Sequence, residues 1–500
     1  MKSIATLIAA ANLLATLATA QPLPHYTVTD LNKTLPDGWS SAATFVSDNG
    51  IVTGIATAPD HTQHAVLWQG GKIVQIDKRD LNSGAFGVNE RGQATVQSET
   101  KDPDPNNENF CAYNTGKGPS LKCLPFVWQD GVLTQLRPLK GGVNGAVGTI
   151  NSRGEVVGIA ENGTRDPDCP PGVAFTGAGP QVLNFQAVIW GPNGEPRVLP
   201  PLKGDTVGLA VFNNDNGQAA GASGKCSNTV LPPIAFGPHL VLWERDGSAV
   251  DLGSLGGTVN REAGVGHMSL AINNRGQVAG ISAIPGDPAG TPSTASHAFL
   301  WTREKIGIDC APTGLNGCMR DLGTLEGDFV SVGLGINDRG EVVGLSIGEQ
   351  GLRGFFWQNG VMTDLNKLVT PRDPTFTLQF PGINSRGEIA GSGMTSTGET
   401  HAFLATRAPT GASAGPKNTT VIARQITLDG TASFSADGKP LTYLWSIPQG
   451  SPSAAILHGT TATPEVQFAS GRNAYIFQLT VTDSTGTSAT ELTTVNFQGN

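Results

Sequence analysis

The sequence has no long run of apolar residues at helical or heptad-like spacing, so it gives no sign of a helical bundle or a coiled coil. Charged residues make up only 15% of the 500 residues, and the 32 Lys and Arg residues are scattered, so no nucleic-acid partner is predicted. Beyond residue 20, no stretch is apolar enough to span a membrane. The net charge, 32 − 41 = −9, favours a soluble acidic protein.

Catalytic and cofactor motifs are missing as well. The sequence contains no GxSxG, no P-loop, no GxGxxG and no HExxH motif. It also has no CxxC or HxxxH pair, so a metal site built from Cys and His is not indicated. We therefore expect neither an enzyme nor a bound cofactor, and we leave calcium open as a possible ligand of acidic loops.

Glycine and proline are abundant instead, with 66 and 33 residues. Together they form about a fifth of the chain, which is above average usage and fits frequent turns between short strands. Six cysteines are present, and an even number in an exported chain implies disulfides, for which spacing alone leaves every pairing open. They are Cys111, Cys123, Cys169, Cys226, Cys310 and Cys318.

The first twenty residues have the features of a cleavable secretory signal. Lys2 supplies the positive start, residues 4–17 are mostly apolar, and Ala18-Thr19-Ala20 fits the small-residue cleavage pattern. A membrane anchor is the alternative, but the apolar segment is shorter than a bilayer requires. We predict export, with cleavage after Ala20 and a secreted, periplasmic or cell-surface location.

A nine-residue pattern, INSRGEVVG from Ile150 to Gly158, recurs along the chain. Six further copies begin at Val46, Val88, Asn213, Ile272, Ile336 and Ile383. In such a hairpin, Asn can bond its own backbone two residues on, and Gly supplies the positive φ that closes the turn. We assign this turn role to Asn89, Gly92, Asn151, Gly154, Asn214, Gly217, Asn273, Gly276, Asn337, Gly340, Asn384 and Gly387.

Each copy belongs to a unit of four short apolar segments, and in six units the third segment ends in Trp. Four strands per unit, repeated every 40 to 65 residues, are typical of a β-propeller blade. We predict an all-β protein with a seven-bladed β-propeller over residues 21–407. The last unit lacks a fourth strand, and YTVTDLN from Tyr26 would supply it and close the ring.

These units resemble the HAF repeat of exported bacterial proteins. The His-Ala-Phe triplet begins at His297 and at His401, with a Val variant at His64, and strand, turn and Trp positions recur together. The resemblance implies export and repeat architecture, and no defined activity. Because the His recurs at one strand position, we predict a structural hydrogen bond for it instead of general base chemistry.

After a predicted linker at residues 408–417, the pattern changes. Residues 475–481 alternate, with Tyr475, Phe477, Leu479 and Val481 on one side, as in a half-buried antiparallel strand. The DGTAS, LTYLW and LTVTDSTG stretches resemble the PKD family of extracellular immunoglobulin-like domains. We predict a small β-sandwich over 418–500. Asp429, Asp437 and Asp483 are calcium candidates, although turn roles beside Gly explain them more simply.

The propeller is expected to have unequal faces. Long connections between second and third strands, residues 97–123, 160–186, 222–239 and 282–296, emerge on one face, which we call the long-loop face, and such loops often carry function. The turns on the other face, the hairpin face, are mostly tight. Loop positions in this topology favour the pairings Cys111–Cys123, Cys169–Cys226 and Cys310–Cys318.

Five acidic residues of the long-loop face are candidate ligand contacts. They are Asp102, Asp104, Glu108, Asp166 and Asp168. Hard oxygen ligands suit calcium, and a carboxylate pair would suit a carbohydrate-active enzyme. We expect a non-enzymatic binding or adhesion protein, monomeric, with an extracellular glycan or protein partner. A carbohydrate-active hydrolase or lyase and a purely structural extracellular protein are the alternatives.

Overall fold

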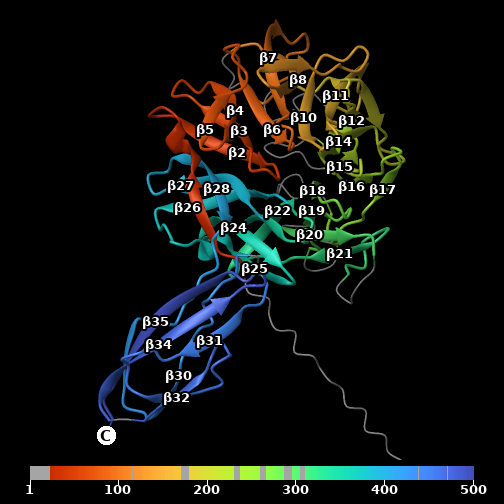
Figure 1. Ribbon diagram of the computed structural model, residues 1–500. Helices are drawn as coiled ribbons and strands as arrows, with labels where there is room; N and C mark the ends of the chain where they lie inside the picture. The colour runs from red at the N-terminus through yellow and green to blue at the C-terminus, as the bar shows by residue number, and fades with distance from the viewer. Residues whose placement is uncertain are drawn as a thin grey trace, which may run out of the picture. The chain divides into compact units, whose positions relative to one another are not determined.

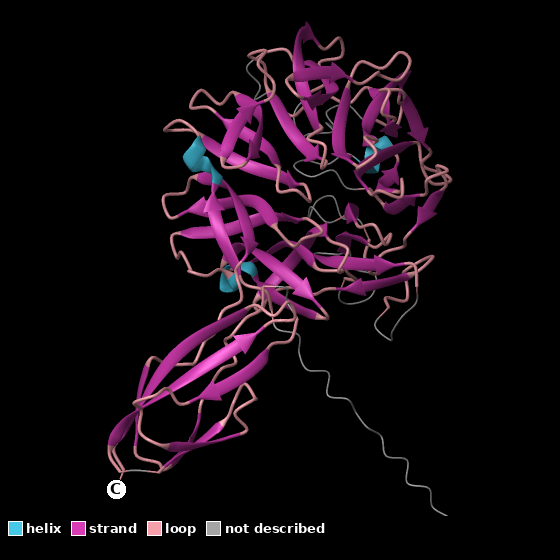
Figure 2. Cartoon of the chain, in the orientation of Figure 1, coloured by secondary structure: helices cyan, strands magenta, loops and turns pink. Residues whose placement is uncertain are grey.

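Figure 1 shows the computed structural model, which describes residues 23–113, 118–169, 180–229, 237–258, 266–286, 295–304, 310–436, 439–469 and 471–499. The predicted signal sequence, residues 1–20, and Asp437 lie outside the described residues. Among the residues described, helix is confined to α1 (Cys226–Thr229) and to two 3₁₀ turns, η1 (Leu31–Thr34) and η2 (Leu365–Leu368) (Figure 2). The predicted all-β class is confirmed.

The chain divides into two compact units: residues 26–406, here the N-terminal unit, and residues 407–499 together with 23–25, here the C-terminal unit. The N-terminal unit contains seven four-stranded sheets, numbered 1 to 7 in chain order. In sheets 1 to 6, four consecutive strands pair in sequence order. Sheet 7 combines β26, β27 and β28 with β1, which comes from the start of the unit.

The first strand of every sheet carries a β-bulge. These strands are β2 (Ser40–Val46), β6 (Ser83–Val88), β10 (Gly145–Ile150), β14 (Val207–Asn213), β18 (Met268–Ile272), β22 (Asp328–Ile336) and β26 (Phe376–Ile383). The bulge brings the Val332 carbonyl oxygen to 1.9 Å from where a Cβ on Gly344 would stand, so the second strand needs glycine there. Six of the seven sheets have this glycine, in the sequence positions Gly54, Gly158, Gly221, Gly280, Gly344 and Gly391.

The second and third strands form the buried middle of each sheet. The second strands are β3 (Val52–Thr57), β7 (Ala94–Pro103), β11 (Val156–Arg165), β15 (Ala219–Gly224), β19 (Val278–Ala283), β23 (Val342–Gly348) and β27 (Ile389–Thr395). The third strands are β4 (Gln63–Gln69), β8 (Leu121–Gln129), β12 (Leu183–Trp190), β16 (His239–Trp243), β20 (Ser296–Thr302), β24 (Gly351–Gln358) and β28 (Thr400–Arg407).

The fourth strands are three to five residues long and mostly partly exposed. Such short edges offer little backbone for pairing with another chain. They are β5 (Lys72–Gln75), β9 (Val132–Gln135), β13 (Pro196–Leu199), β17 (Ala249–Asp251), β21 (Cys318–Asp321), β25 (Val361–Asp364) and β1 (Tyr26–Asp30).

The apolar core of this unit lies between neighbouring sheets. Separate buried clusters join sheets 1 and 2, 2 and 3, 3 and 4, 4 and 5, and 5 and 6. A further cluster packs Ala390 and Ala402 of sheet 7 against Val46 and Trp68 of sheet 1. Strands β23 and β24 of sheet 6 also pack against β26 of sheet 7. Each sheet therefore packs against the sheets before and after it, and the seventh packs on the first.

Three of the tryptophans at the ends of third strands bond to the connection that enters their sheet. The indole N–H of Trp190 donates to the Arg137 carbonyl oxygen at 2.8 Å, and that of Trp243 donates to Pro200 O at 2.7 Å. In sheet 1, Trp68 donates to Thr34 Oγ1 at 3.0 Å. These three tryptophans thus join consecutive sheets, whereas Trp301 donates to Leu315 O in the connection between the third and fourth strands of its own sheet.

The C-terminal unit is a two-sheet structure with orders β29-β35-β34-β31 and β30-β33-β32. Its strands are β29 (Asn418–Val421), β30 (Gln425–Thr427), β31 (Thr442–Ser446), β32 (Ala454–Leu457), β33 (Glu465–Phe468), β34 (Asn473–Thr482) and β35 (Ser488–Phe497). The four residues predicted to share the inner face of β34 are all fully buried, and they pack with Trp445. Disulfides are not needed here, since the core is large.

Residues 408–417, predicted as a linker, are fastened to the C-terminal unit. Gly411 exchanges backbone hydrogen bonds with Phe434, and the backbone N–H of Ala414 donates to Glu491 Oε2 at 2.7 Å. The sequence of this segment, which is rich in Gly, Ala and Ser, does not predict these contacts. It has no apolar pattern, and the contacts are made by its backbone.

Candidate functional site

The recurring hairpins end at a shared polar layer. In all six Asn turns the side-chain Oδ1 accepts a hydrogen bond from the backbone N–H four residues on, at 2.8–3.2 Å. The six turn glycines have φ between 71° and 83°. The twelve assigned residues, Asn89, Gly92, Asn151, Gly154, Asn214, Gly217, Asn273, Gly276, Asn337, Gly340, Asn384 and Gly387, thus lie at equivalent places in six turns.

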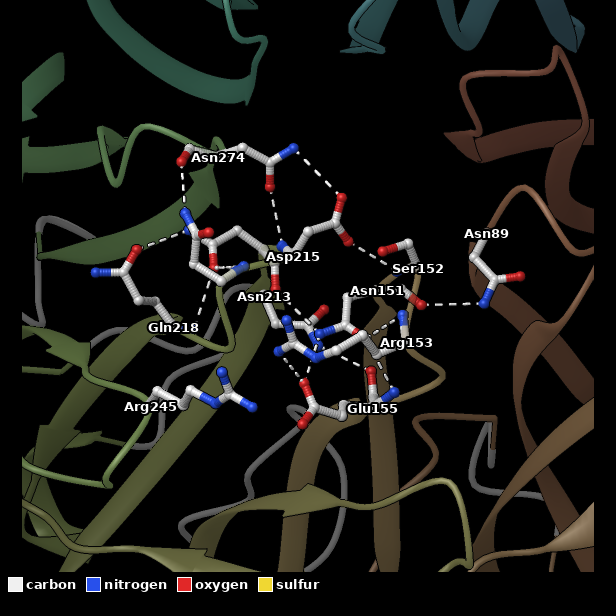
Figure 3. A network of polar contacts seen from close by, with 12 residues as sticks. Asn89, Asn151, Ser152, Arg153, Glu155, Asn213, Asp215, Gln218, Arg245 and Asn274 are labelled. Atoms are coloured by element: carbon white, nitrogen blue, oxygen red, sulfur yellow. Dashed lines mark hydrogen bonds and ion pairs between the residues drawn. The ribbon is translucent and has the colours of Figure 1, made fainter.

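The same asparagines also connect one sheet to the next (Figure 3). Asn151 Nδ2 donates to the Asn214 carbonyl oxygen at 3.0 Å, and Asn214 Nδ2 donates to Asn273 O at 2.9 Å. From sheet 7, Asn384 Nδ2 donates to Ser47 O in sheet 1 at 2.8 Å. We call these six asparagines and Ser47 the Asn belt. Sequence reasoning missed the inter-sheet bonds, although an amide, unlike a carboxylate, still has N–H donors after its oxygen caps the turn.

Residues that follow the Asn belt repeat the link through their side chains. The backbone N–H of Ser152 donates to Asp215 Oδ1 at 2.8 Å, and that of Asp215 donates to Asn274 Oδ1 at 2.9 Å. The Asn belt and the residues that follow it line a cavity of about 110 Å³. That volume holds only a few water molecules, so this end of the unit is a scaffold feature and too small for an oligosaccharide.

The five acidic candidates of the long-loop face separate into two groups. Asp102 and Asp168 are exposed, and Asp102 lies 3.5 Å from Lys122 Nζ. Asp104, Glu108 and Asp166 are buried. Their oxygens accept hydrogen bonds from their own loops and neighbouring ones: Glu108 Oε1, for example, accepts from the backbone N–H groups of Val182 and Leu183 at 2.6 and 2.9 Å.

A buried carboxylate that the sequence did not single out, Glu161, joins this group. Asn144 Nδ2 donates to both Asp104 Oδ2 (2.8 Å) and Glu161 Oε2 (3.1 Å), and Gln181 Nε2 donates to both Glu108 Oε1 (3.2 Å) and Glu161 Oε1 (3.0 Å). Two side-chain amides thus hold three carboxylates together. The arrangement anchors the loops of sheets 2 and 3 to each other.

Burial, and then the carboxylate of Glu108, raise the pKa of Glu161 to about 8. Between pH 4.5 and 8 the folded protein keeps a proton on Glu161, whereas the unfolded chain has released it. The free energy of unfolding therefore falls as pH rises, and the contribution of Glu161 is lost once pH has passed through 8. We expect urea unfolding to show stability falling between pH 6.5 and 8.5, and Glu161→Gln to remove most of that fall. His267, whose pKa burial lowers to about 4, titrates below this window. Equal slopes in both proteins would contradict the assignment.

A buried apolar cluster, here called the apolar plug, joins the long loop of sheet 2 to sheets 3 to 6. Phe110 and Cys111 from the sheet 2 loop are buried with Phe185, Leu209 and residues from the first and second strands of sheets 3 to 6. The loop that carries Asp104 and Glu108 therefore reaches the middle of the unit. The surface available to a partner on this face lies around the plug.

The three predicted disulfides are confirmed: Cys111–Cys123, Cys169–Cys226 and Cys310–Cys318, with Cα–Cα distances of 5.3, 4.9 and 5.1 Å. The second joins a loop of sheet 3 to a loop of sheet 4. The first and third each join a connection to the strand that follows it, β8 and β21, across 12 and 8 residues.

Removing these bonds should weaken the fold more for the bond that closes the longer loop, because the entropy of loop closure rises with the logarithm of loop length. The Cys169–Cys226 bond spans 57 residues and Cys310–Cys318 only 8. We expect replacing both cysteines by Ala to cost about 4 kcal/mol for the longer bond and about 2.5 kcal/mol for the shorter. Guanidinium unfolding measures both, and a larger loss for the short bond would contradict the chain-entropy argument.

Two of the recurring histidines lie beside carboxylates, while the third, His64, has its Nδ1 3.1 Å from Gln75 Nε2. His297 Nδ1 is 2.9 Å from Asp321 Oδ2, and His401 Nδ1 is 3.1 Å from Asp30 Oδ2, each joining a third strand to the end of a fourth. These aspartates also cap the following turn through Oδ1. A structural hydrogen bond, as predicted for these histidines, fits this geometry.

No group of three or more His, Cys, Asp or Glu side chains within the described residues is arranged to hold a metal ion. The calcium candidates Asp429 and Asp483 serve turns: Asp429 Oδ1 accepts from the backbone N–H of Thr431 at 2.9 Å, and Asp483 Oδ1 accepts from that of Thr485 at 2.9 Å. Among the helices described, none is long and apolar enough to cross a membrane.

Comparisons with known proteins identify the C-terminal unit. A family model described as a PKD domain matches residues 414–497. The solution structure of the PKD domain from KIAA 1837 protein is 27% identical, covers 18% of this chain and 86% of that chain, and has a TM-score of 0.16 on the whole chain. The PKD prediction is confirmed. No curated protein matches the chain.

Two Bacteroides thetaiotaomicron structures align over most of the chain. The extracellular domain of the putative hybrid two component system BT3049 is 9% identical over 95% of this chain and 58% of its own length, with a TM-score of 0.37. BT4661, a SusE-like surface located polysaccharide binding protein, is 11% identical over 86% of this chain and 45% of its own, with a TM-score of 0.14. This chain therefore spans less than two thirds of either. Neither likeness carries an argument about function, because both TM-scores lie below 0.5.

Proposed function

We propose that residues 26–406 form a seven-bladed β-propeller of the HAF-repeat kind, closed by β1, and that the PKD-like sandwich follows it. The order of sheet contacts supports closure, since sheet 7 packs on sheet 1 and the Asn belt joins them through Asn384 and Ser47. A closed ring leaves no sheet face uncovered at either end. The disulfides and the predicted signal sequence support export to an oxidising compartment.

We propose a non-catalytic binding role, with an extracellular glycan or protein held on the long-loop face. One observation carries this proposal: the described parts of the long loops are held in place by disulfides and by buried hydrogen bonds. Disulfides fasten those of sheets 2, 3 and 4, and buried carboxylates tie sheet 2 to sheet 3. Loops fixed on a rigid scaffold are typical of binding surfaces. The enzyme alternative has less support, because Asp104, Glu108 and Asp166 are buried and hydrogen-bonded.

The mature full-length chain should be screened on a glycan array and in pull-downs from extracellular matrix and culture supernatant. We expect charge reversal at the exposed acids Asp102 and Asp168 to change binding of the ligand found. Reversal of exposed Lys72 and Arg245, on the hairpin face, is the matched control and should leave binding unchanged. No partner for a folded sample, or sensitivity only to the hairpin-face control, would refute the proposal.

A further inference from the structure

A groove of about 500 Å³ lies at sheet 7, within the usual size range of small-ligand sites. Five segments line it: β1, η1, η2 with the residues after it, the start of β26, and the turn after β27. The turn after β27 is a connection between second and third strands, so the groove belongs to the long-loop face. We call it the sheet 7 groove.

Hydrogen bonds hold the walls of the sheet 7 groove in place. Asn366 Oδ1 accepts from the backbone N–H of Leu378 at 2.8 Å, which fixes η2 to β26. The backbone N–H of Thr370 donates to Tyr26 O at 2.8 Å, and that of Ser396 donates to Thr375 O at 2.8 Å. The groove is therefore preformed, and a ligand would bind without ordering its walls.

The aromatic ring of Phe376 lines the groove and occupies space that a side chain at position 393 would need. Phe376 is partly exposed and meets Phe403 edge to face, with ring centroids 6.3 Å apart. A Cβ on Gly393 would stand 2.4 Å from the Phe376 ring. At the position equivalent to Gly393, the other six sheets have Ala or Ser, namely Ala56, Ser98, Ala160, Ser223, Ser282 and Ser346. Only sheet 7 has glycine at this position, and the space left by the missing side chain holds the Phe376 ring.

The cations and the carboxylates of the sheet 7 groove differ in how they are engaged. Asp30 accepts from the backbone N–H of Asn32 and contacts His401, while Asp373 Oδ1 accepts from the backbone N–H and the hydroxyl of Thr375 at 2.9 and 2.6 Å. Lys33 and Arg372, both exposed, form no ion pair and no side-chain hydrogen bond with any described residue, although the charge of Lys33 is near enough to Asp373 to help the Thr375 hydrogen bonds lower the pKa of that carboxyl. The groove thus offers two exposed cations beside a fixed aromatic face.

We propose that the sheet 7 groove binds a saccharide that carries a carboxylate, such as a uronic acid unit. The apolar face of the sugar ring packs on Phe376, and the carboxylate pairs with Arg372 and Lys33 through charge-assisted hydrogen bonds. Thr27 and Ser396 present hydroxyls to the sugar hydroxyls. The inference rests on the binding function proposed above and names its ligand class and place.

Calorimetry on the full mature chain tests this with trisaccharides of galacturonate, glucuronate and mannuronate, each beside its carboxyl-reduced counterpart. We expect at least one uronate to bind at least about tenfold more tightly than its reduced form. The difference should shrink between 50 and 500 mM salt. Equal affinity for both forms would overturn the assignment of a carboxylate.

Three variants assign the binding to this groove. The double variant Lys33→Gln, Arg372→Gln should weaken uronate binding by about 10- to 100-fold and leave the reduced sugar unaffected. Phe376→Ala should weaken both. Gly393→Ala should weaken both in the native background and have no further effect beside Phe376→Ala, because it acts through the ring. Arg245→Gln is the control that changes nothing, and thermal unfolding confirms that each variant folds.

Failure of this inference is distinguishable from failure of the proposed function. Uronate binding that survives the Lys33/Arg372 and Phe376 variants, or glycan binding confined to sugars without a carboxylate, overturns the groove assignment and leaves a long-loop-face binding protein standing. A folded chain that binds no uronate, no other glycan and no protein overturns both.

Discussion

Asn214→Asp is expected to lower the free energy of unfolding of the N-terminal unit by about 2–4 kcal/mol. The carboxylate keeps the acceptor that caps the turn, but it has no donor for the Asn273 carbonyl oxygen, 2.9 Å away, or for Gln218 Oε1, 2.8 Å away. Asn214 is only 4% exposed, so the new charge also loses water. Urea unfolding at neutral pH measures the loss.

Asn216→Asp in the same turn is the matched control. Asn216 Nδ2 also donates to the next sheet, to Asn274 O, but the residue is exposed, so water can replace the lost donor. We expect less than about 1 kcal/mol for this change. If both substitutions cost the same, the Asn belt contributes no more than an ordinary surface turn, and the argument for it fails.

Trp243→Ala is expected to cost about 4–5 kcal/mol. The side chain is fully buried in the core between sheets 3 and 4, and its indole N–H donates to Pro200 O. Alanine leaves a cavity between two sheets and an unbonded carbonyl oxygen in the connection that joins them. Guanidinium unfolding followed by circular dichroism gives the difference in free energy.

Sheet 2 supplies the comparison for this prediction. Trp128 occupies the same strand position, but it is only partly buried and its indole makes no hydrogen bond with the described residues. Trp128→Ala should therefore cost roughly 2 kcal/mol. A loss as large as that of Trp243→Ala would show that the indole hydrogen bond and full burial do not explain the recurring Trp.

The repeated hairpin turns could be predicted from the sequence because they depend on residues close together in the chain. A turn such as Asn151-Ser152-Arg153-Gly154 needs a capping amide and a positive φ, and both requirements are legible in four residues. The three disulfides were also predictable, because strand counting placed each pair of cysteines in the same or neighbouring loops. Alternation over residues 475–481 fixed which face of β34 is buried.

What sequence reasoning missed depends on partners that are distant in the chain. The donor bond from Asn89 ends on Asn151, 62 residues away. Glu161 lies at the polar end of a strand, and nothing near it signals the amides of Asn144 and Gln181 that hold it. Asp104 and Glu108 lie in a segment rich in Pro and Asn, which is the composition of a solvated turn. In the structure this segment is nevertheless folded inward, and both carboxylates accept hydrogen bonds from backbone N–H groups.

The candidate ligand site illustrates the same limit. The five acidic residues were chosen because they lie in the longest loops, and three of them prove to be buried. The sheet 7 groove was invisible by this criterion, because its turn after β27 is short and its parts come from both ends of the unit. The glycine at position 393, where the other sheets have Ala or Ser, is visible in the sequence. Its role can be inferred only from the structure, in which the Phe376 ring packs against Gly393.

Amide hydrogen exchange across the seven sheets tests most directly whether the N-terminal unit is one closed ring. If β1 closes sheet 7 and sheet 7 packs on sheet 1, the inner strands β2 and β26 should be protected as strongly as β14 and β18, with one common free energy of opening. An array with free ends would instead show protection that declines toward sheets 1 and 7. That gradient would contradict the closed propeller.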